Sequence, residues 1–460
     1  MRDLTAMLAK FVEIVSYDFC NDTAKKTRFI QRRTSRLKGH EFAQAMMVPN
    51  AFLEAETLNS LATRMQKTNA TCCVSASALC QKINTRGAEH FMKLCFGKVL
   101  KEIVGAFYAS SNDLLNLRRF NRVLVEDSTK IELNEKLSFY FQGTGGVASK
   151  SAVKIDYIFD YLSEETVDVE FYSGNIPDQA LACRIMPILK KDDLVLRDLG
   201  YYALNALKEI EEKEAFYISR FQTGVSVYTS EECEKPVDLA RFLDQLACNG
   251  IVDVKVFIGS KKHPVRLVAC QISEEALNKR HRDANRAAQR RGTAISKKKK
   301  SLLKYCIFIT NVSEEILSSI AVMSTYRARW RIELIFKQWK SCLNLHVFKG
   351  YNRERIYCFL YGRLIMVLLL GSMCSTLIPY AHALGYELSC FKLFKYLIAD
   401  HVLFRAIQEK TLSQFLDQLV KDVPRRLCMG KRKKFSLRTN VRMSNNYYRE
   451  QERGSEADVA

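Results

Sequence analysis

Residues 122–129 read Arg122-Val-Leu-Val-Glu-Asp127-Ser-Thr129, a short apolar and β-branched run that ends in acidic residues. A run of this composition predicts a strand whose side chains alternate between two faces. Val123, Val125 and Asp127 therefore share one face. Glu126 points to the other face and is not a candidate for the same site. We expect a buried strand that carries the Asp127 carboxylate where the strand gives way to a loop.

A second run of the same kind lies further along the chain, as Asp193-Leu-Val-Leu-Arg-Asp198-Leu-Gly200-Tyr-Tyr202. Asp198 shares a face with the apolar residues at alternate positions before it, and it too ends a strand. The carboxyl ends of strands form the usual ligand-binding edge of an open α/β sheet. Strand-end aspartates are also common turn formers and helix caps, so each one alone has a structural alternative. Asp192 and Asp193 precede the strand and are not candidates.

A third segment, Tyr326-Arg-Ala-Arg329-Trp-Arg-Ile-Glu333-Leu-Ile-Phe-Lys-Gln-Trp-Lys340, has the composition of one helix, without Pro or Gly. At about 100° per residue, several polar residues lie together on one side of this helix. Its members are Tyr326, Arg329, Glu333 and Lys340. An apolar stripe on the adjoining face should pack on the core: Ile332, Ile335, Phe336, Trp339 and Leu343. One carboxylate beside two cations and a phenol suits a phosphate and a metal ion. The alternative is a solvated face with an i,i+4 pair of Arg329 and Glu333.

A metal-dependent nuclease needs more than one carboxylate. Two divalent cations about 3.5–4 Å apart activate the attacking oxygen and stabilise the leaving one. Carboxylate oxygens are the ligands that such hard cations prefer. The candidates for catalysis and metal binding are Asp127, Asp198 and Glu333.

The spacing Y-(2)-R-(3)-E-(6)-K resembles the signature of bacterial insertion-sequence DDE transposases. Val125-Glu-Asp127-Ser-Thr129 is similar to the first acidic motif of that family, and Asp198-Leu-Gly200-Tyr201 to the second. Ile309-Thr-Asn311 is similar to the approach to the third. The resemblance spans roughly residues 25 to 380, with the motifs in the family's order.

This resemblance implies an α/β (α+β) fold with a ribonuclease-H-like mixed sheet, flanking helices and a β-rich insertion. It implies that Asp127, Asp198 and Glu333 hold two Mg²⁺, with Mn²⁺ as a substitute. The enzyme would bind the ends of an insertion sequence, cleave them by hydrolysis and join them to target DNA by transesterification. Its DNA phosphate contacts would be Tyr326, Arg329 and Lys340.

Relatives with this tetrad often cut the second strand through a DNA hairpin, flipping a base onto an aromatic residue of the preceding strand. Tyr305 is the candidate for that base stacking, because Tyr305-Cys-Ile-Phe-Ile309 contains no Trp. Leu199 stands where relatives often carry a basic residue. Both departures leave the hairpin step open.

Two other functions fit the same residues. One is a metal-dependent DNA nuclease or resolvase that does not join strands, and the N-terminal specificity region and large insertion disfavour it. The other is a catalytically decayed copy that acts as a DNA-binding repressor. The intact triad and tetrad disfavour that reading.

The charge of the chain indicates a polyanionic partner. Its 460 residues carry a formal net charge of +21, and its isoelectric point is near 9.3. Such a field attracts nucleic acid. The expected partner is double-stranded DNA (terminal repeats and target), bound by a homodimer in the bacterial cytoplasm at the nucleoid.

A membrane protein and a metal- or disulfide-rich protein are both disfavoured. The longest apolar run, Leu364–Ile378, is shorter than the roughly 20 residues of a membrane span, so we expect a buried core helix. The 15 cysteines are odd in number and include no C-x-x-C pair, which fits reduced thiols of a cytosolic protein.

Changes in composition and hydrophobic pattern along the sequence divide the chain into five segments. Residues 1–115 read as a helical DNA-binding region, with two short helices at Leu58–Met65 and Val74–Ile83 that suit either a helix-turn-helix or a plain bundle. Residues 116–222 and 303–379 are the two parts of the catalytic domain. Residues 223–302 are a β-rich insertion with a basic run, and 380–460 a helical region with a basic tail that we expect to be partly disordered.

Within these segments, patterns of period two and of helical period predict individual elements. The expected strands before residue 222 are 122–127, 137–141, 153–159, 167–172, 193–198 and 215–221. Those of the insertion are 225–228, 252–258 and 265–272. The expected helices are 178–190, 202–214 and 351–376. The basic run between Lys279 and Lys300 is a candidate DNA phosphate contact.

Overall fold

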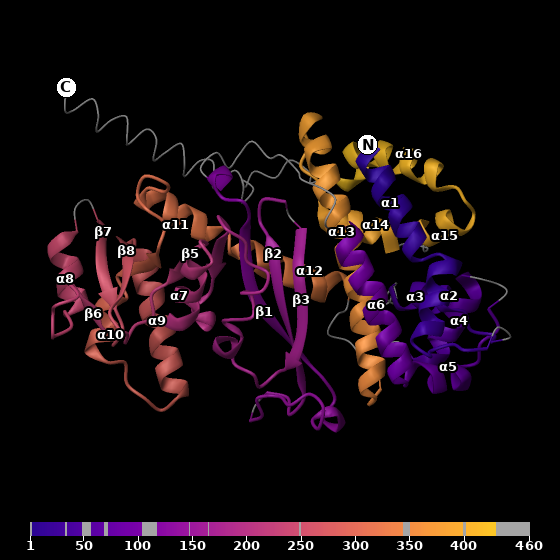
Figure 1. Ribbon diagram of the computed structural model, residues 1–460, viewed down its shortest axis with the longest axis horizontal. Coiled ribbons are helices and arrows are strands. Elements are labelled where there is room, and N and C mark those ends of the chain that lie inside the picture. Colours follow the sequence, from indigo (N-terminus) through magenta and orange to yellow (C-terminus); the bar gives the residue numbers. More distant parts are fainter. Residues whose placement is uncertain are drawn as a thin grey trace. The chain divides into compact units, whose positions relative to one another are not determined.

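The computed structural model describes residues 2–32, 35–47, 57–68, 72–103, 117–146, 148–163, 165–247, 250–343, 350–398 and 402–428. The chain divides into two compact units (Figure 1). Unit 1 comprises residues 1–111, 128–176 and 331–434, and unit 2 comprises residues 112–127, 177–330 and 435–460.

Unit 1 is mainly helical. Its N-terminal helices are α1 (Arg2–Ile14), α2 (Tyr17–Lys26), α3 (Gly39–Met47), α4 (Leu58–Thr68), α5 (Ala76–Ile83) and α6 (Arg86–Ile103). Its later helices are α12 (Trp330–Leu343), α13 (Arg353–Ala383), α14 (Cys390–Ile398), α15 (Val402–Gln408), α16 (Leu412–Asp422) and the π-helix η7 (Val423–Leu427). It also holds the 3-10 helix η3 (Glu135–Leu137) and the antiparallel strands β2 (Ala152–Asp160) and β3 (Glu165–Ser173).

Helix α13 forms the centre of unit 1 and packs along α6 and α3 (Figure 1). It is long and apolar enough to cross a membrane by length and composition, but 67% of its most apolar window is buried inside the protein. The close approach to α3 needs a glycine, since a Cβ on Gly362 would lie 2.5 Å from the Met46 carbonyl oxygen. The prediction of a core helix is confirmed, and the helix continues through Pro379 to Ala383.

Unit 2 contains most of the strands. These are β4 (Leu194–Arg197), β5 (Phe216–Arg220), β6 (Val227–Tyr228), β7 (Ile251–Ile258), β8 (His263–Gln271), β9 (Tyr305–Thr310) and the first five residues of β1 (Val123–Glu132). Its helices are α7 (Leu204–Glu212), α8 (Leu239–Leu246), α9 (Glu274–Arg290), α10 (Lys297–Leu302) and α11 (Ser319–Arg327), with 3-10 turns η2 (Leu117–Arg119), η4 (Asp178–Leu181) and η5 (Leu199–Tyr201).

The strands form a nine-stranded mixed sheet in the order β3-β2-β1-β4-β5-β9-β8-β7-β6. Strand β4 is parallel to both β1 and β5, whereas β5, β9, β8, β7 and β6 follow one another antiparallel. The first strand thus lies beside the fourth, as expected for a ribonuclease-H-like sheet. The strands of the predicted insertion extend this same sheet through β9.

An ion pair sets the register of β1 against β4. Arg122, just before β1, donates from Nε to Asp193 Oδ1 at 3.0 Å and from Nη2 to the Ile188 carbonyl at 2.9 Å. The Asp193 side chain is buried and also accepts from the Lys190 backbone N–H at 2.8 Å. Asp193, set aside as a ligand from its position, therefore has a structural role.

Two predicted elements are wrong. Residues 137–141 are not a strand, because Asn134 caps the 3-10 turn η3 and the Phe141 N–H bonds back to the Leu137 carbonyl. Residues 178–190 form a succession of 3-10 turns, because Pro187 has no N–H to continue a helix.

Apart from the Tyr326–Lys340 segment, which is described below, the other predicted strands and helices are confirmed, although β1 and α13 continue five and seven residues beyond their predicted ends. The C-terminal helices are confirmed as far as residue 428, and the basic tail (Lys431–Lys434) lies outside the described residues.

Candidate functional site

Asp127 and Asp198 meet at one level of two neighbouring parallel strands. The pairing of β1 with β4 runs from Val123↔Leu194 to Glu126↔Arg197, and the next position on each chain is the aspartate. Asp198 directly follows β4 and keeps extended backbone angles. Asp127 is not at the end of its strand as predicted, since β1 continues to Glu132. It is the pairing with β4 that ends there, so the two carboxylates still share an edge.

Arg329 joins the two aspartates. Its Nη1 lies 3.2 Å from Asp127 Oδ2, and its Nε lies 3.9 Å from Asp198 Oδ1. The Arg329 side chain is 9% exposed, against 18% for Asp127 and 41% for Asp198. One guanidinium therefore offsets the repulsion between two carboxylates in a mostly enclosed place.

The residues one position earlier form an ion pair on the opposite face of the sheet. Arg197 Nη2 lies 2.6 Å from Glu126 Oε2, and both side chains are buried. Because side chains alternate along a strand, this pair faces away from Asp127 and Asp198. The prediction that Glu126 faces away is confirmed, and the ion pair gives this buried carboxylate a countercharge.

The predicted single helix from Tyr326 to Lys340 is wrong, because the chain turns at Ala328–Arg329 between α11 and α12. The N–H groups of Ala328 and Arg329 bond to the carbonyls three residues earlier, at 2.9 and 3.1 Å, which tightens the last turn of α11. Arg329 therefore lies on a turn between the two helices, and its guanidinium reaches Asp127.

Tyr326 is buried beside the same strand ends. Its hydroxyl donates to the Arg197 carbonyl at 3.1 Å, and its ring lies 4.9 Å from that of Phe308 between centroids. Burial raises the pKa of the Tyr326 phenol well above its ordinary value. The hydroxyl thus acts as a neutral hydrogen-bond donor that fixes the end of α11 against β4.

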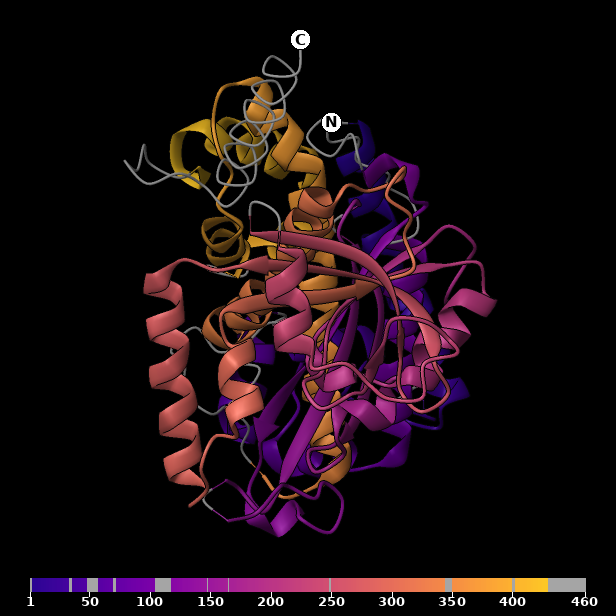
Figure 2. The same cartoon turned by 90° about the vertical axis from the view of Figure 1, so that its left-hand side faces the viewer.

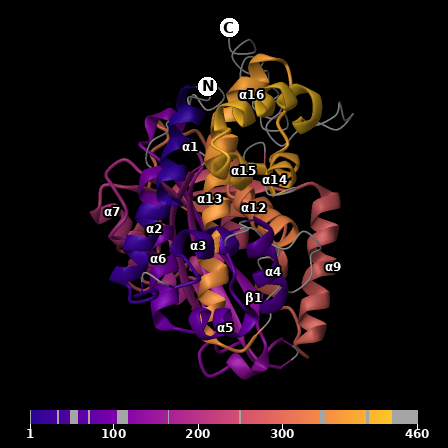
Figure 3. The same ribbon diagram turned by 90° about the vertical axis from the view of Figure 1, so that its right-hand side faces the viewer.

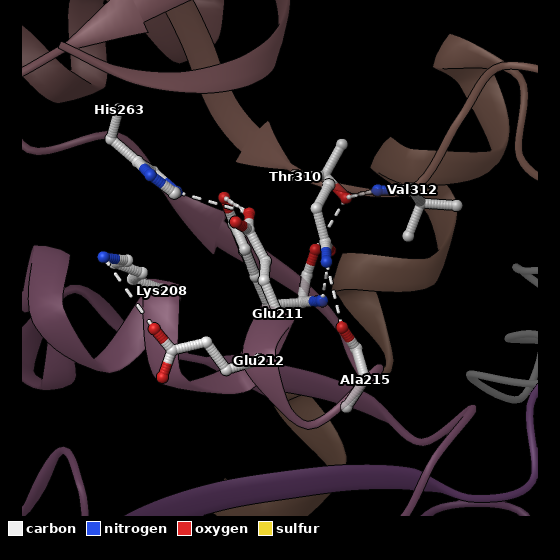
Figure 4. Close-up of polar contacts among 9 residues, drawn as sticks. Lys208, Glu211, Glu212, Ala215, His263, Thr310 and Val312 are labelled. Carbon is white, nitrogen blue, oxygen red and sulfur yellow. Dashed lines mark hydrogen bonds and ion pairs between the residues drawn. The ribbon is translucent and has the colours of Figure 1, made fainter.

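Two networks hold the segment that leads into α11. Asn311 accepts from the Tyr217 N–H at 2.9 Å and donates to the Ala215 carbonyl at 2.9 Å, which continues the contact of β9 with β5. Thr310 Oγ1 donates to the Tyr217 carbonyl and accepts from the Val312 N–H; Figure 4 shows Thr310, Val312 and Ala215 in this arrangement. These side chains make Ile309-Thr-Asn311 a fixed junction.

Arg266 on β8 supplies the second network. It donates to both Asp253 carboxylate oxygens and, from Nη1, to the carbonyls of Val312 and Leu317 at 3.1 and 2.7 Å. Since Arg266 is 7% exposed, this charge is enclosed and fully engaged. The loop between β9 and α11 is therefore tied to the sheet, which in turn places Tyr326 and Arg329.

Glu333 and Lys340 lie on α12, in unit 1. Glu333 is exposed and Lys340 is partly exposed. The apolar stripe is confirmed where side chains are described: Phe336 and Trp339 pack on Tyr157, with ring centroids 6.0 and 4.7 Å away. The convergence of Glu333 with the two aspartates stays a prediction. Within the described residues, no three His, Cys, Asp or Glu side chains are grouped as a metal site.

Tyr305 begins β9 and is 3% exposed. Its hydroxyl donates to Asp244 Oδ1 at 2.6 Å, and Lys304 Nζ lies 2.7 Å from the same carboxylate oxygen. The ring would have to leave this position to stack on a base. Its role in base stacking stays a prediction.

Two positioning residues were missed from the sequence: Arg197, which pairs with Glu126, and Arg266. Glu126 and Arg197 each stand directly before a candidate aspartate. Because these two residues have opposite charges and equivalent positions on their strands, the sequence could have predicted that they pair. Arg266 gave no such sign, because its partners lie 13 to 51 residues away.

The family of this chain follows from comparisons with known proteins. A family model described as "Transposase DDE domain" matches residues 118–369, more than half of the chain. The chain is 26% identical over 415 residues to the transposase for insertion sequence element IS231B of Bacillus thuringiensis subsp. berliner, covering 85% of each chain.

It is also 29% identical over 381 residues to the transposase for insertion sequence element IS1151 of Clostridium perfringens, covering 77% of this chain and 78% of that one. A solved piggyBac transposase synaptic complex with hairpin DNA matches with a TM-score of 0.45 and 11% identity, over 95% of this chain and 87% of that chain. On the family model and the two sequence relatives, this chain belongs to the bacterial insertion-sequence DDE transposases.

Proposed function

We propose that this transposase binds the ends of its insertion sequence, cleaves them by phosphodiester hydrolysis and joins them to target DNA by transesterification. The observation that supports this best is the position of Asp127 and Asp198, which meet at one level of adjacent parallel strands and share one guanidinium. Two neighbouring carboxylates that share one guanidinium are a donor set that suits a divalent cation.

Asp127, Asp198 and Glu333 are the proposed ligands of two Mg²⁺, for which Mn²⁺ substitutes. When bound, these ions supply an activated attacking oxygen and stabilisation of the leaving oxygen. The rigid β1–β4 register holds the first two ligands, whereas Glu333 is presented by a helix. Glu333 is one of the exposed residues of α12.

Arg329 and Lys340 are the proposed phosphate clamps near the scissile bond. The planar guanidinium of Arg329 can exchange its carboxylate partners for two phosphate oxygens, and the ammonium of Lys340 acts as a point charge. Tyr326 is the proposed third phosphate contact. Its hydroxyl would give up the Arg197 carbonyl for a phosphate oxygen at little cost in hydrogen bonds.

Helix α9 provides a surface for the DNA backbone. Four exposed cations fall within about 80° of arc along it: Lys279, Arg282, Arg286 and Arg290. None of its residues is fully buried, and Arg280 anchors it by donating to the Leu303 and Tyr305 carbonyls at 3.1 and 2.8 Å. Helix α10 carries further exposed lysines at positions 297–300. Helix α9 is the long salmon helix in Figures 2 and 3.

The remaining parts of the proposal concern assembly and place of action. We place terminal-repeat recognition in the helical region 1–115, base stacking of a hairpin intermediate at Tyr305, and synapsis in a homodimer that acts on nucleoid DNA in the cytoplasm. No second function is favoured by a specific contact, but the nuclease and the decayed repressor give distinct results in one experiment.

That experiment uses duplexes that carry the inverted repeats read from the DNA flanking the gene, with MgCl₂ and a supercoiled target plasmid. Nicking at the repeat ends followed by joining to the plasmid is expected. Nicking without joining would indicate the nuclease, and binding without nicking the decayed repressor. Asp198→Asn and Glu333→Gln should abolish nicking while retaining the gel shift, since each removes an anionic ligand but keeps the shape.

The matched control is Asp192→Asn at the other end of β4. Asp192 is exposed and has a positive φ of 63°, a conformation that Asn adopts readily, so this variant should cleave normally. Cleavage by the Glu333→Gln protein at the wild-type rate would remove Glu333 from the proposed ligands.

A further inference from the structure

Two cysteines face each other across neighbouring antiparallel strands of unit 2. Cys270 on β8 is paired directly with Cys306 on β9. Directly opposed residues in such a ladder have Cα atoms about 4.5–5.5 Å apart, which lies within the range of about 4.4–6.8 Å that a disulfide needs. Both cysteines are free and only partly buried, so small reagents can reach them.

The two thiols differ in acidity. A hydrogen bond from Cys270, helped by the guanidinium of Arg280 and the charge of Arg220, lowers the pKa of Cys306 to about 5 against the opposing effect of burial. The same hydrogen bond, together with burial, raises the pKa of Cys270. The hydrogen bond between the two thiols and the nearby guanidinium therefore favour ionisation of Cys306 over ionisation of Cys270.

Arg280 is held in place independently of the thiols. Its Nη1 donates to the carbonyls of Leu303 and Tyr305, the latter being the residue before Cys306. The guanidinium is therefore fixed beside the strand that bears the thiolate. A low-pKa cysteine next to a cation, partly exposed and facing a second cysteine, is the arrangement of a redox-sensitive pair.

We propose that Cys270 and Cys306 form a redox-modification site that hydrogen peroxide converts reversibly into a disulfide between β8 and β9. The Cys306 thiolate attacks one peroxide oxygen; the S–O bond forms, the O–O bond breaks and hydroxide leaves. Cys270 then attacks the sulfur of the resulting sulfenic acid; the S–S bond forms, the S–O bond breaks and water leaves with the thiol proton. The hydroxide takes up the proton that Cys306 lost on ionisation, so two thiols and one peroxide give one disulfide and two waters.

The bond would cross-link the sheet close to the proposed catalytic centre. Phe308, two residues beyond Cys306 on β9, packs against the Tyr326 ring. Thiols of a reducing cytosol would reopen the bond by exchange.

The test treats the full-length protein with hydrogen peroxide, blocks remaining thiols, digests it without reductant and identifies linked peptides by mass spectrometry. The expected result is a Cys270–Cys306 link that disappears with dithiothreitol. In Cys270→Ser, Cys306 should instead be trapped as a sulfenic acid by dimedone. Cys306→Ser should give no link, whereas Cys233→Ser should leave the link unchanged.

A second cysteine pair within the protein serves as an internal control. Cys20 and Cys95 interact with each other but are both buried, so they should stay unlinked under the same treatment. At pH 6.5, iodoacetamide should alkylate Cys306 at least about tenfold faster than the partly exposed Cys183, whose pKa is raised chiefly by burial. Absence of the Cys270–Cys306 link in the folded protein, or equal alkylation rates of Cys306 and Cys183, would overturn the proposal.

Discussion

Replacement of Arg329 by Ala tests the electrostatic design of the site most directly. It leaves Asp127 and Asp198 at one level of the sheet without the guanidinium that lies 3.2 and 3.9 Å from them. Removing one partner of a fully buried ion pair costs about 3–5 kcal/mol. Because the Asp198 side chain is 41% exposed, solvent screens part of the repulsion. We therefore expect a loss of about 1–3 kcal/mol in the free energy of unfolding.

The assay is thermal unfolding of wild type and variant, each with and without millimolar MgCl₂. At about 2–4 °C per kcal/mol, the melting temperature of the variant should fall by about 2–12 °C without added cation. Mg²⁺ should raise the melting temperature of the variant more than that of the wild type, because no guanidinium competes for the carboxylates. Single-turnover cleavage should remain impaired, since the phosphate contact is lost.

Two variants serve as controls. Arg329→Lys keeps a cation and should lose less stability, while Arg327→Ala changes an exposed cation of the same turn and should melt near the wild type. If Arg329→Ala is as stable as the wild type, the carboxylates do not depend on this guanidinium. If it is less stable but gains nothing extra from Mg²⁺, the pair of aspartates is not a cation site.

Three further predictions concern DNA binding, catalysis and pH. Affinity for end DNA should fall steeply between about 50 and 200 mM salt. In a plot of the logarithm of the binding constant against the logarithm of the salt concentration, Arg282→Ala and Arg286→Ala should each reduce the steepness of the slope by about 0.9. Gel shifts at several salt concentrations measure this slope. The Lys340→Ala variant should have a free energy of unfolding within about 1 kcal/mol of the wild type, yet it should slow end cleavage or joining. Full cleavage and joining by this variant would contradict the role of Lys340. Burial, followed by the charge of Asp160, raises the pKa of Glu165 to about 8, so the folded state keeps a proton that the unfolded chain loses above its ordinary value of 4.5. The contribution of Glu165 to the free energy of unfolding should therefore decline from pH 4.5 through 8. The Glu165→Gln variant should show less of this decline, and at pH 8 it should be more stable than the wild type by roughly 1–3 kcal/mol. Denaturant titrations measure both effects.

The sequence alone was sufficient to place the two aspartates at one edge of the sheet. Alternating apolar residues before Asp127 and Asp198 require a buried strand in each case, and parallel neighbours bring equivalent positions together. The predicted strands of the insertion were also correct, because their hydrophobic patterns are local properties of the chain. The family followed from spacing and resemblance, and the candidate triad and tetrad stay predictions made on the same grounds.

Only the tertiary structure decided how the tetrad residues are used. The Tyr326–Lys340 segment has the composition of one helix, yet it turns at Ala328–Arg329 and sends a guanidinium to Asp127, 202 residues earlier. Local propensity amounts to tenths of a kcal/mol per residue, whereas an enclosed ion pair and a buried phenol contribute more.

The same reason explains Arg266 and the Glu126–Arg197 pair, neither of which was assigned a role from the sequence. Each buried charge needs a partner, and the partner of Arg266 or Arg197 is brought to it only by the pairing of strands distant in sequence. Pattern therefore determined which residues lie on a face, and the pairing of distant segments determined which charges meet there.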